Sequence, residues 1–416
     1  MASTTTPPSP GKRHLAVLAL GSVILSVDGY DLFTVGTIGP SLLHDRSWGA
    51  TPSTLGTLGS VTALGMPFGS ILAGWAADRW GRRLPLTIVM VWISAAMLAA
   101  ALAPDLTALG LARFCTGIGI GALAPLVGAA VSDGAPPRRR TLHLAIAMGS
   151  IGIGGTVSAL LGRILLSHVH FQTLFLIGAL AVVLAPVIWW VFPAGQPHRD
   201  DEPRRVPARE LFTADRRGPT LLFWVATFAS MALVYSTTAW LPTVLVRNGY
   251  SLNSSLEFTI VFTIGASAGG LLMAVPSDRG HLKGATVFTF GLAAAALLAL
   301  SSKQPHPVLL VVSAMAGLGS LGCQNMIISY MARYYPPRLR GTALGLGLGV
   351  GRLGSIVGPT YLSIATSLND SPRAGFVAFV VPALLGVIVV SFLPATRGRP
   401  EQSAPPAVAP IAVEPL

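Results

Sequence analysis

Apolar runs long enough to cross a lipid bilayer recur along the whole 416-residue chain. A helix of about 20 apolar residues spans the hydrocarbon core, and a helix satisfies its own backbone hydrogen bonds there. Hydrophobic residues make up 52% of the chain and charged residues 11%. Soluble globular domains carry about 25% charged residues. The sequence therefore predicts an all-α protein that crosses a membrane many times.

Twelve transmembrane helices are predicted, at 14–43, 53–76, 84–103, 106–131, 141–163, 171–192, 219–246, 253–276, 284–301, 307–331, 342–366 and 372–393. With the N-terminus in the cytoplasm, 21 of the 28 lysines and arginines fall in the cytoplasmic segments. The positive-inside rule then predicts that both termini are cytoplasmic, in a cell inner or plasma membrane. This distribution accounts for the net charge of +12 without a nucleic acid partner.

An internal repeat at an offset of 200 residues divides the chain. The matched pairs are Asp78 and Asp278, Arg79 and Arg279, Gly117 and Gly317, Gly119 and Gly319, Pro136 and Pro336, Pro137 and Pro337, Arg138 and Arg338, and Arg140 and Arg340. Several matches at one offset predict two pseudo-symmetric bundles of six helices, duplicated in parallel orientation as in transporters whose halves rock against each other.

Five regions follow from this division. They are a cytoplasmic N-terminal tail (1–13), an N-terminal six-helix bundle (14–192), a charged, Pro-rich cytoplasmic linker (193–218), a C-terminal six-helix bundle (219–393) and a cytoplasmic tail predicted to be disordered (394–416).

Two carboxylates, Asp28 and Asp31, interrupt the apolar run from Leu15 to Leu43. At a spacing of three residues they lie about 60° apart on one helix face. Two acids this close and away from water cannot both remain ionised cheaply, so we expect at least one to exchange a proton near neutral pH. The pair is predicted to couple transport to protons, with Asp31 as the carrier. The alternative is a polar pair that faces a watery vestibule.

Two arginines also lie inside predicted spans, Arg113 in the fourth and Arg352 in the eleventh. A guanidinium offers a planar fork of donors that grips a carboxylate in two places, so either could hold an anionic substrate. Arg113 could instead form an internal ion pair with Asp28 or Asp31. The other candidate substrate contacts are Gln324, Asn325, Tyr330 and Trp240, which could supply amide donors and aromatic faces, although each alone is more often a packing residue.

A cluster of charges joins the second and third spans, with Asp78, Arg79, Arg82 and Arg83 around Gly81. Charge pairs at such a seam must break and re-form if the halves rock, so they would bias one open state against the other. Alternatively, they only anchor the helices at the membrane surface. The predicted gating residues are Asp78, Arg79, Gly81, Arg82, Arg83, Asp133, Asp278, Arg279, Arg338 and Arg340.

The G-x-x-x-D-R-x-G-R-R pattern that ends at Arg83 resembles the loop signature of the major facilitator superfamily, and the resemblance runs from about residue 14 to 395. Finer features resemble one branch, the aromatic acid:proton symporters. They are DGYD at 28–31, RFCTGIGIGALAP at 113–125, WLPTVLVRNGYS at 240–251, and Gln324 with the run YYPPRLRGTALGLGLGVGRLG at 334–354. Two features depart from the family pattern. Asp133 stands where a glutamate is usual, which shortens its reach, and the second copy of the loop motif lacks the G-R-R ending.

This resemblance implies the major facilitator fold and roles in transport for Asp28, Asp31, Arg113, Asp78 and Asp278. The expected function is proton-coupled uptake of an aromatic carboxylate such as a benzoate or hydroxybenzoate, by alternating access. A proton-coupled antiporter that exports drugs or metabolites is a second hypothesis. A ligand sensor that does not transport is a third, and the absence of a large soluble signalling domain argues against it.

Other chemistry finds no support in the sequence. The eight histidines show no ligand spacing, and no Ser–His–Asp arrangement is apparent, so neither an enzyme nor a metal site is predicted. Gly349, Gly351 and Gly354 spell G-x-G-x-x-G, but they follow no strand, so no dinucleotide cofactor is predicted. The spacing of Gly341, Gly345 and Gly349 is interpreted as a surface for close helix packing.

Overall fold

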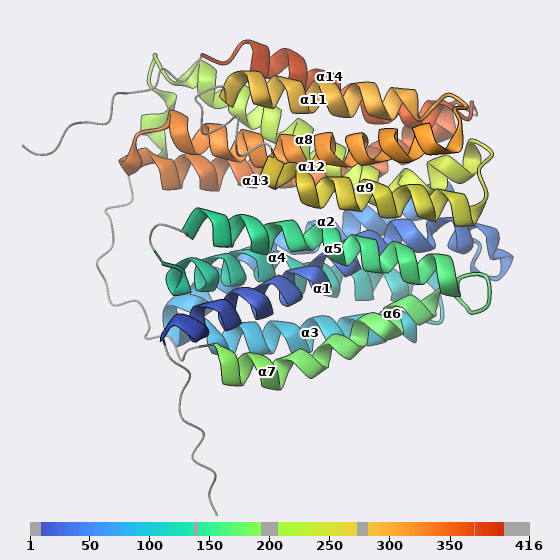
Figure 1. Ribbon diagram of the computed structural model, residues 1–416, viewed down its shortest axis with the longest axis horizontal. Coiled ribbons are helices and arrows are strands. Elements are labelled where there is room, and N and C mark those ends of the chain that lie inside the picture. The colour runs from blue at the N-terminus through green and yellow to red at the C-terminus, as the bar shows by residue number, and fades with distance from the viewer. Residues whose placement is uncertain (1–9, 137–139, 193–206, 273–281, 370, 395–416) are drawn as a thin grey trace, which may run out of the picture.

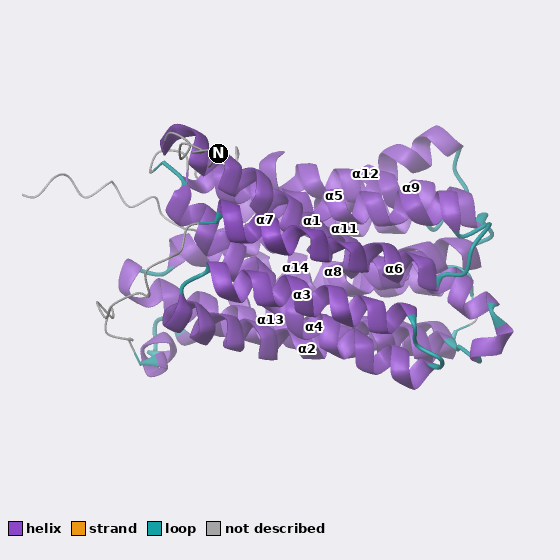
Figure 2. Cartoon of the chain, turned by 90° about the horizontal axis from the view of Figure 1, so that it is seen from below, coloured by secondary structure: helices purple, strands orange, loops and turns teal. Residues whose placement is uncertain are grey.

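The computed structural model describes residues 10–136, 140–192, 207–272, 282–369 and 371–394, and these residues form helices and connecting loops without strands (Figures 1 and 2). The N-terminal half contains α1 (Pro10–His44), η1 (Arg46–Trp48), α2 (Pro52–Trp80), α3 (Arg83–Ala101), α4 (Leu106–Gly134), α5 (Arg140–Leu165), α6 (Gln172–Ala179), η3 (Leu180–Val183) and α7 (Leu184–Val191). The C-terminal half contains η4 (Ala208–Phe212), α8 (Arg217–Arg247), α9 (Leu252–Leu272), α11 (Leu282–Ala299), α12 (His306–Tyr334), α13 (Pro337–Leu368) and α14 (Ala374–Ser391).

Helices α1 to α7 form one bundle and α8 to α14 a second bundle beside it (Figure 1). Among the described residues, ten helical segments are long and apolar enough to cross a membrane, and α6, η3 and α7 together make one of them. Two further long helices, α9 and α13, complete the set, and α13 is less apolar than the others because it carries Arg352 and seven glycines. The prediction of twelve spanning helices in two six-helix bundles is confirmed.

The two bundles repeat the same contacts at the predicted offset of 200 residues. A Cβ added to Gly117 on α4 would meet the backbone carbonyl of Thr62 on α2, and one added to Gly317 on α12 would meet that of Phe262 on α9. Gly119 and Gly319 likewise face Ile93 and Ala293. The repeated residues therefore bring equivalent helix pairs together, because only glycine allows backbones to approach so closely.

Two ends of the molecule matter for the site. We call the end where α1 begins and α2 turns into α3 the linker end, and the end that contains η1 the far end; the linker end is on the left in Figure 1. The bundles contact each other from the middle to the far end. Hydrogen bonds join Ser60 to Thr360 (2.7 Å) and Thr156 to Thr263 (2.8 Å) across this seam.

The interpretation of Gly341, Gly345 and Gly349 as a packing surface is wrong for this conformation. A Cβ at any of them would meet nothing within 4 Å, whereas Gly354 and Gly358 on the same helix lie against the backbone of α8. The reason is the helical period, since the two sets of glycines lie on different faces of α13.

Helix ends differ in places from the predicted spans. The first helix begins at Pro10 and so includes 10–13 of the predicted tail, and the sixth span contains a 3₁₀ segment at Leu180–Val183. Residues 193–206 and 395–416 lie outside the described residues, so the five-region division stays a prediction.

Candidate functional site

A buried ion pair between α1 and α4 lies at the centre of the N-terminal bundle. Arg113 donates from Nη1 to Asp31 Oδ1 (2.5 Å) and from Nη2 to Asp31 Oδ2 (2.8 Å), and from Nε to Thr62 Oγ1 (3.2 Å). Asp31 is 0% exposed and Arg113 is 1% exposed. The fork therefore meets the carboxylate in the bidentate arrangement that stabilises both charges. Of the two uses predicted for Arg113, this conformation has the internal ion pair.

The second acid, Asp28, is in a different situation one turn earlier on α1. It is 6% exposed and lies within electrostatic range of Asp31 and Arg352. No hydrogen bond or ion pair to Asp28 is formed by any residue that the structure describes. The pair predicted from spacing thus consists of one acid held by an arginine and one without such a partner.

Arg352 on α13 reaches towards the middle of the molecule from the C-terminal bundle. Its Nη1 donates to Met66 Sδ (3.1 Å) and to Tyr235 Oη (3.2 Å), and the Tyr235 hydroxyl donates to Met66 Sδ (3.3 Å). Within the described ranges no carboxylate forms an ion pair with Arg352. A cation inside the membrane region without an acid of its own is costly, and such residues usually mark a substrate or ion route.

A layer of side chains closes the space between the two arginines and the far end. It surrounds a cavity of about 10 Å³ lined by Leu32, Val35, Gly59, Thr62, Met66, Arg113, Tyr235 and Pro359. That volume holds at most about one water molecule. The side chains around this cavity thus leave no room for a ring-sized ligand beside Arg113.

The other predicted substrate contacts are divided between two environments. Gln324 and Asn325 are partly or fully exposed near the middle of α12, and no described residue hydrogen-bonds to either side chain. Trp240 and Tyr330 are fully buried. Their polar atoms are engaged, since the Trp240 indole donates to the Pro359 carbonyl (3.1 Å) and the Tyr330 hydroxyl to the Pro394 carbonyl (2.8 Å). The structure does not bring these two residues to Arg352, and their predicted role in binding stays a prediction.

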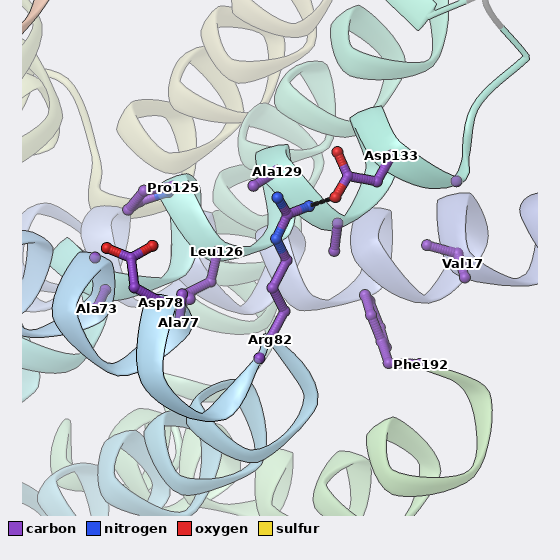
Figure 3. Close-up of a pocket in the computed structure, with 14 residues that line it drawn as sticks. Val17, Ala73, Ala77, Asp78, Arg82, Pro125, Leu126, Ala129, Asp133 and Phe192 are labelled. Atoms are coloured by element: carbon purple, nitrogen blue, oxygen red, sulfur yellow. Dashed lines mark ion pairs between the residues drawn. The ribbon is translucent and has the colours of Figure 1, made fainter. Parts of the chain in front are cut away.

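A second constellation lies at the linker end, in a cavity of about 480 Å³ between α1, α2 and α4. Figure 3 shows Asp78 at one side of this cavity and an ion pair between Arg82 and Asp133 at the other. Asp133 thus reaches a partner despite its short side chain. Gly81 has a φ of 70°, which allows the tight turn between α2 and α3.

The remaining predicted gating residues are dispersed at the linker end. The Arg83 guanidinium lies over the Trp189 ring at 4.2 Å, and Arg338 pairs with Glu210 of η4 at 3.4 Å. Arg79 and Arg340 are exposed. Asp278 and Arg279 lie outside the described residues, so the gating roles of the whole set stay predictions.

Sequence reasoning missed Met66 and Thr62. Both lie in the second span, where a methionine or a threonine is usually a packing residue. The only signal in the sequence is their place on one helix face, four residues apart, and it does not indicate which arginine each will meet.

The sequence as a whole was compared with known families. The model of the Major Facilitator Superfamily matches residues 22–359 and 255–414. The chain belongs to this superfamily. It is therefore a transporter and not an enzyme, as predicted.

Curated relatives in the superfamily match nearly the whole chain. The benzoate transport protein of Acinetobacter baylyi is 29% identical over 94% of this chain and 92% of its own length. The gentisate transporter of Corynebacterium glutamicum is 32% identical over 92% and 88%. The 4-hydroxybenzoate transporter PcaK of Pseudomonas aeruginosa is 27% identical over 92% and 93%. The chain is thus related to transporters of aromatic acids.

Solved structures support the fold. The D-xylose-proton symporter superposes with a TM-score of 0.73 at 15% identity, over 92% of this chain and 99% of that one. A partially occluded inward-open form of XylE from Escherichia coli gives a TM-score of 0.72 at 15% identity, over 94% and 100%. At this level of identity the likeness concerns the fold alone.

Proposed function

We propose that the protein takes up an aromatic carboxylate together with protons by alternating access across the cell membrane, with both termini in the cytoplasm. Relatives that transport benzoate, gentisate and 4-hydroxybenzoate support this substrate class. The linker end would then face the cytoplasm, and the contacts at the far end would close the site to the outside.

The observation that carries the proposal is the contrast between the two central arginines. Arg113 already holds the Asp31 carboxylate with both arms of its fork, whereas the Arg352 guanidinium donates hydrogen bonds only to a thioether and a phenol among the described residues. A substrate carboxylate would give Arg352 the anionic partner that it lacks. We therefore assign the substrate's carboxylate to Arg352 in this conformation, where the sequence had left both Arg113 and Arg352 as candidates.

The same contrast supports a choice between the two acids as the proton carrier. Asp31 is compensated by Arg113, but Asp28 is buried without a hydrogen-bonded partner among the described residues. A buried carboxylate without a hydrogen bond is costly even with Arg352 in electrostatic range, so we assign the proton to Asp28 in place of Asp31, the carrier predicted from the sequence. Its proximity to Arg352 lets the proton and the substrate affect each other directly.

Uptake into proteoliposomes with an imposed pH gradient tests the proposal. A panel of labelled benzoates, hydroxybenzoates and cinnamates is offered from the acidic side. We expect accumulation against the concentration gradient, loss of accumulation when a protonophore is added, and alkalinisation of the compartment that the substrate leaves. Acidification of that compartment would indicate antiport and contradict the proposal.

The variant Arg352→Gln tests whether Arg352 binds the substrate's carboxylate. Loss of hydrogen bonds to a charged group costs about 1.5–3 kcal/mol, which corresponds to about 10- to 150-fold weaker uptake at low substrate concentration. Arg247→Gln is the matched control, since Arg247 is an exposed arginine at the end of α8. Equal uptake by the Arg352 variant and this control would remove Arg352 from the binding site.

A further inference from the structure

We propose that the thioether of Met66 occupies the place of the substrate's carboxylate on Arg352 and Tyr235, and that the substrate binds by displacing it. This inference rests on the proposed function and adds a residue from the opposite bundle to the carboxylate subsite.

The first support is the set of contacts that Met66 makes. Its sulfur accepts from the Arg352 guanidinium (3.1 Å) and from the Tyr235 hydroxyl (3.3 Å), and these two donors are also bonded to each other (3.2 Å). Two donors thus converge on one sulfur atom. A thioether is a weak acceptor, whereas both donors are of the kind that binds a carboxylate strongly. The sulfur therefore marks the position where an anionic oxygen would fit better.

The second support is where the three residues come from. Met66 belongs to α2 of the N-terminal bundle, and Tyr235 and Arg352 belong to α8 and α13 of the C-terminal bundle. The thioether therefore bridges the bundles at the level of the two arginines. A carboxylate that replaced the thioether would accept the hydrogen bonds of both donors. Met66 of α2 would then no longer be bonded to α8 and α13, and the bridge between the bundles would be lost at that level.

The third support is the side chain itself. Met66 is almost fully buried, and it lies at the edge of the closing layer next to the small cavity beside Arg113. Methionine has three rotatable bonds and a polarisable sulfur, so its tip can leave the donors without a backbone shift and then contact an aromatic ring. Met66 can thus occupy the carboxylate position before the substrate binds and contact the substrate's aromatic ring afterwards.

The experiment compares Met66→Leu with the wild type in equilibrium binding of benzoate and 4-hydroxybenzoate to the purified protein. Leucine keeps the volume but has no acceptor, so it cannot compete for Arg352 and Tyr235. We expect the Kd of both acids to fall about threefold to tenfold. Tyr235→Phe should raise the Kd, because it removes a donor from the subsite. Met90→Leu on α3 is the matched control, since Met90 is buried and makes no hydrogen bond among the described residues.

A structural readout keeps the test independent of transport. With ¹³C-methyl methionine in all ten positions, the Met66 resonance is identified by its loss in Met66→Leu. Saturating benzoate should shift this resonance, and the Met90 resonance should stay in place. An unshifted Met66 resonance, or an unchanged or higher Kd in Met66→Leu, overturns the inference. If no aromatic acid binds the wild type, the proposed function fails first, and the two failures are thereby distinguished.

Discussion

Asp28 and Asp31 are three residues apart on one helix face, yet only Asp31 is hydrogen-bonded to an arginine among the described residues. Replacing Asp31 with Asn should leave Arg113 buried without a counter-charge, because the pair is almost fully enclosed. Breaking a buried ion pair by removing one partner costs about 3–5 kcal/mol. Asp28→Asn removes no hydrogen bond among the described residues and should cost far less. We expect both variants to lose proton-driven accumulation, and only Asp31→Asn to lose thermal stability in detergent.

Counterflow exchange of substrate separates the two variants further, since it needs binding and bundle movement but no net proton transfer. Asp28→Asn should retain it, and Asp31→Asn should not. Asp105→Asn is the control, because Asp105 caps the N-terminus of α4 through Ala108 (2.8 Å) and asparagine caps equally well. Full uphill uptake by Asp28→Asn would show that the proton is carried elsewhere.

At the residue scale, the sequence indicated candidate site residues, but it did not indicate which of them are in contact. Asp28, Asp31, Arg113 and Arg352 were recognisable because ionisable groups are rare and costly in apolar spans. Whether Arg113 would pair with an acid or await a substrate depends on how α1 and α4 are rotated about their axes, and periodicity does not determine that. The thioether of Met66 gave no electrostatic signal at all.

At the scale of helices, the glycines that repeat at an offset of 200 residues hold equivalent helix pairs together. Ala at Gly117 would clash with the Thr62 carbonyl, and Ala at Gly317 with that of Phe262. We expect each substitution to cost about 1–3 kcal/mol, the usual range for overpacking, and to lower the melting temperature in detergent. The two effects should be similar in size because the two contacts are equivalent.

Gly110→Ala is the control for this prediction, since it lies on the same helix as Gly117 and its Cβ would meet nothing within 4 Å. Alanine favours a helix over glycine, so the control should be neutral or slightly stabilising. A loss of stability in Gly110→Ala as large as in Gly117→Ala would mean that close approach of α2 and α4 is not the cause.

Elements were more predictable than their contacts. The apolar runs predicted the spans within a few residues, and the repeat predicted that two bundles are built alike. The faces of α13 were assigned wrongly because a run of glycines at spacings of two, three and four residues is compatible with packing on several sides. The packing face of α13 is the one that lies against α8. It contains Gly354 and Gly358 and not Gly341, Gly345 and Gly349.

At the scale of the whole molecule, the conformation is what the sequence could not reveal, because the repeat predicts contacts within each bundle and not which end of the seam is closed. The seam between α2 and α13 runs antiparallel, with Gly56 against Ser363, Ser60 against Thr360 and Met66 against Arg352. Continued at the same register, it places Gly74 opposite Gly345. Both glycines face open space here, and we predict that they meet when the linker end closes.

Paired cysteines test this directly, in a chain whose Cys115 and Cys323 have been replaced by alanine and whose 193–206 segment carries a protease site. Ser60→Cys with Thr360→Cys should form a disulfide readily, because their hydroxyls are 2.7 Å apart. The crosslinked halves should stay together after cleavage, and uptake should stop until a reductant is added. Gly74→Cys with Gly345→Cys should crosslink slowly, and faster in conditions that open the far end. Rapid crosslinking of this second pair in a protein already locked at Ser60 and Thr360 would contradict a cycle in which one end closes as the other opens.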